Sequence, residues 1–245
     1  MSLLTSLADK DGFRPRGTHM TRVDAFSDVV FGFAITLLVV SLEVPKTYTE
    51  LHAMLTGFLP FAICFLMFTM VWLDHYRFFR RFGLHDPATI RLNAALLFVV
   101  LFYVYPLKFL FSMLVGEILR TQKIDPFTSA YQVRELMVIY GLGFAAIYGL
   151  ISLLNYQGWL QRNALELNPL ERLLTRSYII DSATVACIGL LSCAIAYIVP
   201  VANAGLAGFT YMLISVQKPI HFSYFGKKVR TLQAATNPPL PTHTA

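Results

Sequence analysis

Residues 22–42 read Arg-Val-Asp-Ala-Phe-Ser-Asp-Val-Val-Phe-Gly-Phe-Ala-Ile-Thr-Leu-Leu-Val-Val-Ser-Leu, and this stretch decides the fold. Its charged residues, Arg22, Asp24 and Asp28, all precede an uncharged apolar run. About 20 such residues cross a bilayer as an α-helix. Asp24 or Ser27 can satisfy the free backbone N–H groups at a helix start, where acids also suit the helix dipole. The stretch therefore predicts a membrane helix that opens near Arg22.

The composition of the whole chain agrees with a membrane protein. Hydrophobic residues make up 56% of the 245 and charged residues 14%, against about 25% charged in an average soluble domain. The mean hydropathy is +0.58. Because Lys and Arg concentrate in cytoplasmic loops of membrane proteins, the net charge of +6 does not indicate nucleic-acid binding. The expected partner is the lipid bilayer.

Six apolar segments predict an all-α, polytopic membrane protein with six transmembrane helices in one bundle. They are residues 25–44, 51–73, 90–115, 136–154, 178–200 and 203–223. The last is the weakest, because Lys218 and Pro219 interrupt it. We expect a polar N-terminal tail at 1–20, a six-helix transmembrane domain at 21–225, and a disordered, Pro-rich C-terminal tail at 226–245. About 20 polar residues precede the first segment, so it is not a cleavable signal peptide.

The distribution of basic residues predicts the orientation. With six spans, both termini share a side with the connections after spans two and four. That side holds fourteen Lys and Arg residues, against four on the other side. Positive residues stay inside, so both termini are expected to be cytoplasmic in a multi-pass protein of the cell membrane. Two further helices are expected at the membrane surfaces, an outer one within 117–135 and an inner amphipathic one at 161–176.

Ionisable residues within apolar spans are costly and are candidate functional groups. In this chain they are Asp28, Asp74, His75, Lys108 and Asp181. For Lys108 we favour snorkelling to the interface, and for Asp181 an ion pair with Arg176. The sequence contains no phosphate loop, dinucleotide turn or nucleophile elbow. The three cysteines lack metal-ligand spacing. Neither an enzyme nor a metal site is predicted.

Four residues of the first span form a stripe along one face of the predicted helix. Val29, Phe33, Thr36 and Val40 follow the spacing i, i+4, i+7 and i+11, which places them on one helix face. Thr36 is the one hydroxyl in the middle of this span, and a threonine there commonly donates to its own i−4 carbonyl. Arg22 and Phe26, at i and i+4, also share a face. From spacing alone, a well-capped interfacial helix explains the polar start.

The motif Arg22-x-x-x-Phe26-Ser27-Asp28, with the apolar run that follows, resembles the signature of the transmembrane protein 175 family. These are potassium-permeable channels of bacteria and, in duplicated form, of animal lysosomes. Trp72 and His75 near the end of span two are similar to a second feature of the family. The resemblance covers spans one to three well, and spans four to six mainly in layout.

The resemblance implies a homotetramer whose first spans line the pore without a conventional selectivity-filter loop. By position, Phe33 takes the constriction, commonly Ile or Leu in the family, and Thr36 the hydroxyl layer between Val29 and Val40. The implied brace of the pore helix consists of Arg22, Phe26, Ser27, Asp28, Trp72 and His75. The permeant ion would be potassium, with no cofactor.

Two other functions stay open at this level. A proton- or solute-coupled transporter could use His75, Asp28 or Lys108 as a relay, and a non-conducting scaffold would use none of them. Coupled transporters usually contain broken helices or polar groups at the membrane midplane. Span one has neither, which favours the channel.

Overall fold

The computed structural model describes residues 12–40, 46–56, 58–119 and 127–236, and these ranges are helical with short connections. The elements, in chain order, are α2 (Arg22–Val40), α3 (Tyr48–Thr56), α4 (Phe58–Phe82), α5 (Pro87–Ile118), α6 (Ala130–Leu160), α7 (Pro169–Ile198), the 3₁₀ helix η1 (Val201–Met212) and α8 (Leu213–Thr236). No strand occurs in the described ranges. The predicted all-α class is confirmed.

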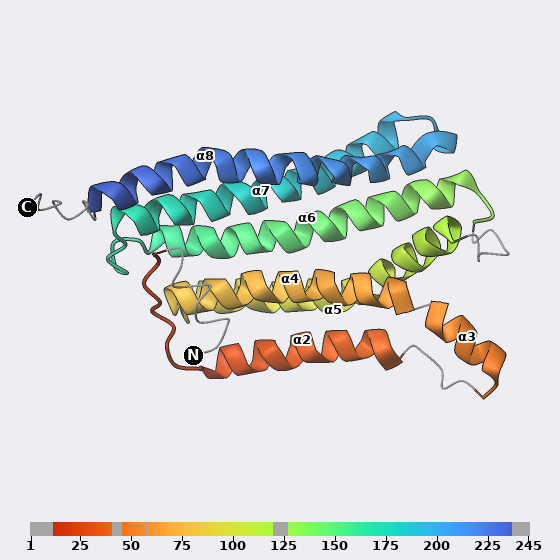
Figure 1. The fold of residues 1–245 in the computed structure, drawn as a ribbon, viewed down its shortest axis with the longest axis horizontal. Coiled ribbons are helices and arrows are strands. Elements are labelled where there is room, and N and C mark those ends of the chain that lie inside the picture. Colours follow the sequence, from red (N-terminus) through yellow and green to blue (C-terminus); the bar gives the residue numbers. More distant parts are fainter. Residues whose placement is uncertain (1–11, 41–45, 57, 120–126, 237–245) are drawn as a thin grey trace, which may run out of the picture.

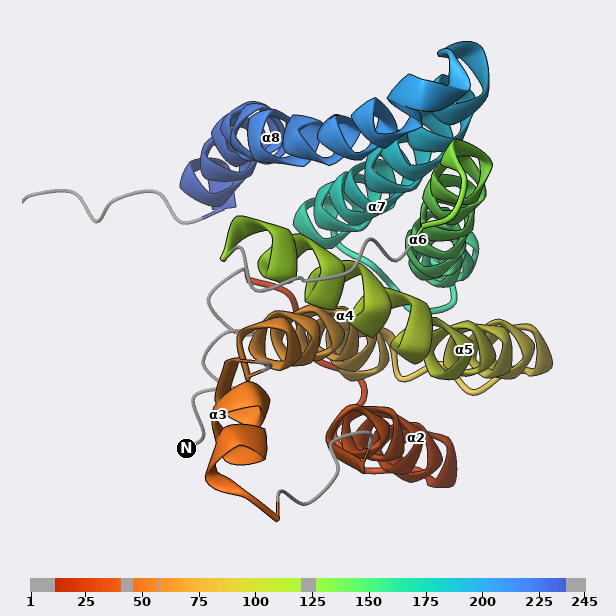
Figure 2. The ribbon, with the colours of Figure 1, turned by 90° about the vertical axis from the view of Figure 1, so that its right-hand side faces the viewer.

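The long helices lie lengthwise beside one another (Figure 1). α2 packs against α4 and α5, α5 against α6, α6 against α7, and α8 against α7 and η1. Seen from one end, α2 and α8 occupy opposite sides of the bundle (Figure 2). The start of α2 and the end of α8 lie at the same end of the molecule, together with the end of α4 (Figure 1). One edge of the bundle is therefore formed by α2.

Within the described ranges, four helices are long and apolar enough to cross a membrane: α4, α5, α6 and α7. They correspond to predicted spans two to five. α2 coincides with most of the first predicted span, while residues 41–45 lie outside the described ranges. η1 and α8 divide the sixth span between them, and Pro219 lies within α8. The count of six spans and the cytoplasmic position of both termini stay predictions.

Several predicted element boundaries were wrong. α4 runs to Phe82 rather than ending near residue 73, because Phe78, Phe79 and Phe82 continue its buried face. The separate amphipathic helix at 161–176 does not form. Instead, α7 begins at Pro169, where Asn168 and Glu171 form a capping box.

The predicted outer surface helix also differs from the structure. Ser129 caps α6, which begins at Ala130, and residues 120–126 lie outside the described ranges. At the C-terminal end, α8 continues as a helix to Thr236, ten residues beyond the predicted start of the disordered tail at 226. The Pro-rich run that suggested disorder begins only after that helix ends.

Part of the predicted polar N-terminal tail packs onto the bundle. Phe13 is 3% exposed. Arg14 and Arg16 contact the fully buried carboxylate of Glu171 at 3.1 and 2.9 Å. The backbone N–H groups of Arg16 and Gly17 donate to the Arg80 carbonyl at 3.1 and 3.0 Å. This segment ties the chain leading into α2 to α4 and α7.

Candidate functional site

α2 has one packed face and one open face. Ser27, Phe31, Ala34 and Leu38 are at most 1% exposed, and they lie on the side that packs against α4 and α5. The open face carries Phe26, Val29 and Phe33, exposed by 60%, 69% and 56%, together with exposed Thr36. The helical periodicity of the sequence explains this division. The side chain of Val40, the last member of the predicted stripe, lies outside the described residues.

Thr36 adds a polar group to the open face. Its hydroxyl donates to the Gly32 carbonyl at 2.8 Å. A hydroxyl oxygen keeps acceptor capacity when its hydrogen is used in this way. The Thr36 oxygen can therefore still accept a hydrogen bond or contact a cation.

A buried polar chain fixes the start of α2. Ser27 donates to the Val23 carbonyl at 2.8 Å and accepts from the Asn93 side-chain nitrogen at 2.9 Å. The Asn93 side-chain oxygen lies 2.8 Å from His75 Nε2. Because that amide oxygen can only accept, His75 carries its proton on Nε2. These hydrogen bonds join α2, α5 and α4.

A second hydrogen bond joins α2 to α4, the helix that carries His75. Trp72 Nε1 donates to Asp28 Oδ1 at 2.8 Å. The rings of Phe31 and His75 lie 5.3 Å apart between their centroids. Asp28 and Ser27 are thus held by different partners at the same level of α2, which restrains rotation of the helix about its axis.

Two residues of the implied brace lie elsewhere. Phe26 belongs to the open face of α2. Arg22 is exposed, and within the described part of the chain it makes no hydrogen bond or ion pair. The structure brings together Ser27, Asp28, Trp72 and His75, and adds Asn93. An amide side chain in the middle of an otherwise apolar span was the signal that could have identified Asn93.

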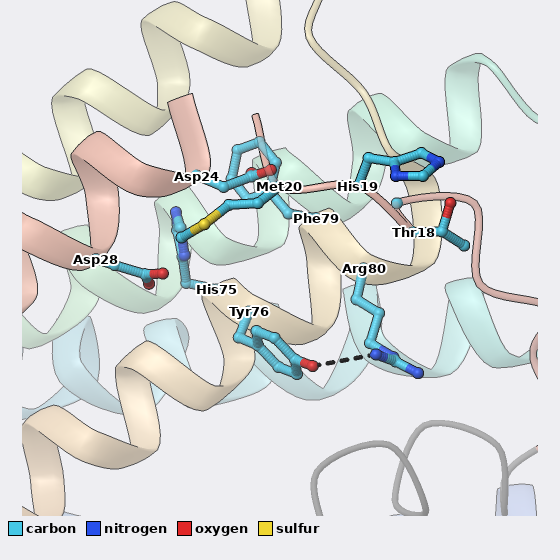
Figure 3. A pocket seen from close by; sticks show the side chains of 10 residues that line it. Thr18, His19, Met20, Asp24, Asp28, His75, Tyr76, Phe79 and Arg80 are labelled. Carbon is cyan, nitrogen blue, oxygen red and sulfur yellow. Dashed lines mark hydrogen bonds between the residues drawn. The ribbon is translucent and has the colours of Figure 1, made fainter. Parts of the chain in front are cut away.

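A cavity of about 270 Å³ lies at the entry to α2. Asp24, Asp28 and His75 line it, with Tyr76 and Arg80, whose hydrogen bond of 3.2 Å is drawn in Figure 3. Asp24 accepts from the backbone and the hydroxyl of Thr21 at 2.9 and 2.8 Å. In the part of the chain that the structure describes, no three His, Cys, Asp or Glu side chains gather to hold a metal ion.

The remaining ionisable candidates have structural partners. Lys108 Nζ donates to the Leu38 carbonyl at 3.3 Å and so contacts α2. Asp181 forms an ion pair, but with Lys218 at 2.5 Å rather than with Arg176. The Arg176 guanidinium lies over the Trp159 ring, 4.3 Å from its centroid. The interpretation of Asp181 as an ion-pair residue holds, with a different partner.

The long apolar helices, with α2 held along one edge of the bundle by hydrogen bonds to α4 and α5, define a helical membrane protein. Residues 22–103 match the family model described as "Endosomal/lysosomal potassium channel TMEM175". A potassium channel of Marivirga tractuosa is 41% identical over 211 residues, covering 82% of this chain and 85% of its own length. The chain belongs to the TMEM175 family of potassium channels, and it is not an enzyme.

Other similar proteins are also named as potassium channels. A potassium channel of Streptomyces collinus is 31% identical over 134 residues, 52% of this chain and 62% of its own length. A crystal structure of a variant of the potassium channel MtTMEM175 is 38% identical, with a TM-score of 0.77 over 89% of this chain and 97% of that one. A lysosomal potassium-selective channel TMEM175 homologue from Chamaesiphon minutus shares the fold, with a TM-score of 0.52 at 24% identity, over 85% of this chain and 96% of that one.

Proposed function

We propose that the protein is a homotetrameric potassium channel of the cell membrane and that the open face of α2 lines its pore. The observation that carries this proposal is the two-faced packing of α2. One side is braced by α4 and α5, and the other exposes Val29, Phe33 and Thr36. A single copy offers no closed passage along this face, so the pore requires copies around a symmetry axis.

Phe33 forms the constriction in this proposal. Its ring is 56% exposed on the open face, and Thr36 follows about one turn further along the helix. Rings of apolar side chains can close a pore by excluding water. Opening then requires a displacement of α2 that widens the ring. The Thr36 hydroxyl oxygens form the adjacent layer that contacts the dehydrating ion.

The polar chain at the start of α2 has a mechanical role. Ser27 and Asp28 hold the packed side against α5 and α4 through Asn93 and Trp72. These bonds keep the Phe33 side directed toward the axis. A pore helix that could rotate freely would present the stripe to lipid or to its neighbours, so the brace determines which residues meet the ion.

Six crossings complete the proposed topology. α2 and the η1–α8 segment join the four helices α4 to α7 that are apolar enough to span. The start of α2 and the end of α8 lie at one end of the bundle (Figure 1), which agrees with an even number of crossings. The excess of basic residues on that side supports a cytoplasmic position for it.

The test is potassium flux into liposomes that contain the purified protein. Phe33→Ala is expected to raise the resting flux severalfold, because a smaller side chain weakens the apolar barrier. Phe98→Ala is the matched control, because Phe98 is 71% exposed but belongs to α5 and not to the open face of α2. Absence of potassium flux from both the unsubstituted protein and Phe33→Ala would overturn the proposal.

A further inference from the structure

A second cavity, of about 350 Å³, lies between α4, α6, α7 and α8, away from the open face of α2. Its polar lining includes five charged side chains: Asp74, Arg77, Arg81, Asp181 and Lys218. Arg81 lies one residue before the end of α4. The cavity is thus near the end of the bundle where α2 begins (Figure 1), the side on which basic residues predict the cytoplasm.

The charges in this cavity are held in place by defined contacts. Arg77 pairs with Asp74 at 3.0 Å, and Lys218 with Asp181 at 2.5 Å. Arg81 is 4% exposed. It donates to the Tyr178 hydroxyl at 2.9 Å and its guanidinium lies 4.0 Å from that ring's centroid. Among the described lining residues, two of the three cations are therefore paired with the two carboxylates, and the third is held by Tyr178.

The two cations that form ion pairs also remain accessible. The side chains of Arg77 and Lys218 are 38% and 37% exposed. A guanidinium has five N–H donors and an ammonium three, and among the described residues each of these two side chains makes one hydrogen bond. Charged groups in spanning helices are costly and mark functional sites by default. An acceptor with several oxygens would satisfy the remaining donors.

We propose that this cavity binds a phosphate group. Arginine forks match phosphate oxygens, and basic pockets between membrane helices on the cytoplasmic side take lipid headgroups. The apolar lining beside the charges, Phe78, Ile151 and Phe222, fits the first carbons of acyl chains. The expected source is therefore an anionic phospholipid rather than free phosphate. The site does not depend on which face of α2 lines a pore.

The first experiment measures the melting temperature of the full-length protein in detergent. The added probes are phosphatidylglycerol, phosphatidylcholine with the same acyl chains, and inorganic phosphate. Phosphatidylglycerol is expected to stabilise the protein at lower concentration than phosphatidylcholine does. Stabilisation by inorganic phosphate as well would identify free phosphate as a second source. Equal effects of the two lipids, with none from phosphate, would overturn the proposal.

Charge-removing variants place the effect in this cavity. Each cation contributes about 1 kcal/mol toward an anionic surface, or about fivefold in affinity. Arg77→Gln with Lys218→Gln should therefore weaken phosphatidylglycerol binding about thirty-fold. Because this pair leaves two acids unpartnered, Asp181→Asn alone is the second variant: it removes one negative charge from the lining and releases Lys218 from its ion pair, so phosphatidylglycerol binding should strengthen about fivefold.

Arg91→Gln is the matched control, since Arg91 is an exposed cation of α5 outside the cavity. It should keep the affinity of the unsubstituted protein for phosphatidylglycerol. If Asp181→Asn also keeps that affinity, the cavity is not the binding site and the proposal is wrong.

Discussion

In the proposed pore, the Thr36 hydroxyl would offer an oxygen to the ion while its hydrogen is donated to the Gly32 carbonyl. Thr36→Val keeps the shape of the side chain and removes that oxygen. If the contact is worth about 1 kcal/mol, the preference for potassium over sodium should fall about fivefold. The reversal potential across a planar bilayer, with potassium and sodium on opposite sides, measures this ratio.

Thr69→Val is the control for that experiment. Thr69 makes the same kind of bond, to the Phe65 carbonyl at 2.8 Å, but on α4. Its replacement should leave the permeability ratio unchanged. An unchanged ratio in Thr36→Val would remove Thr36 from the ion path.

Asn93 supports two buried partners at once. It is 2% exposed, and Asn93→Ala leaves both Ser27 and His75 without their bonds to α5. An unsatisfied buried polar group costs about 1–3 kcal/mol, so a clear fall in melting temperature is expected. Asn155→Ala is the comparison, because buried Asn155 donates within its own helix, to the Ile151 carbonyl. A smaller loss in Asn93→Ala than in Asn155→Ala would contradict the bracing role.

The resemblance suggested six residues for the brace, and the structure shows hydrogen bonds to α4 or α5 partners, or to α2, for four of them. These four are Ser27, Asp28, Trp72 and His75. The resemblance to the family motif gave their positions in the sequence only. Resemblance does not show which side chains meet, and Arg22 and Phe26 lie apart from the others. Asn93 was missed because its partner Ser27 is 66 residues away in the sequence, and only the folded chain brings the two together.

At the scale of elements, α6 and α7 depend on small residues where they meet. A Cβ added to Gly141 would lie 2.7 Å from the Gly189 carbonyl oxygen and would also overlap Cys193. Because backbone atoms cannot move aside, Gly141→Ala should destabilise the protein by about 1–3 kcal/mol. Gly149→Ala on the same helix has no atom within 4 Å of its added carbon. It should be neutral or slightly stabilising, and equal melting temperatures of the two variants would refute this packing.

The contact between the start of α5 and the end of α6, which Asp86 makes, is expected to weaken in acid. Burial alone would raise the pKa of Asp86, but hydrogen bonds from Thr89, Gln161 and Gln157 outweigh it, and the pKa is lowered overall. A lowered pKa stabilises the fold above the ordinary aspartate value of about 4. That stabilisation is lost as the pH falls through the folded-state pKa.

Melting temperatures of the unsubstituted protein and Asp86→Asn, measured over a pH series, test this expectation. At neutral pH the variant should be less stable, because its amide accepts more weakly from Gln157 and Gln161. The difference should shrink below about pH 4. A difference that is constant over the series would show that the Asp86 charge contributes nothing.

The positions of the helices followed from hydropathy, whereas their ends did not. Hydropathy marks the part of a helix that lies in lipid, and helices continue beyond it. α4 keeps Arg80 and Arg81 in its last turn. α7 starts at a capping box within residues whose leucines suggested a separate surface helix. The N-terminal segment was predicted as a tail because the partner of its arginines, Glu171, is distant in sequence.

At the scale of the whole molecule, composition and the motif around Asp28 predicted a membrane channel of this family, and the comparisons confirm that membership. The pore itself cannot follow from one chain, because it would form between copies. The open face of α2, with Val29 and Phe33 exposed, is the part of the subunit that such an assembly would complete.

The most direct test of the pore-lining role of α2 is block of the current by a cationic thiol reagent applied from the cytoplasmic side. Val29→Cys places a thiol about one turn before Phe33 on the open face, so the reagent should reach it and reduce the potassium current. The unsubstituted protein and Phe98→Cys are the controls, and both should keep their current. If Val29→Cys conducts and its current is as insensitive as that of the controls, α2 does not line the pore.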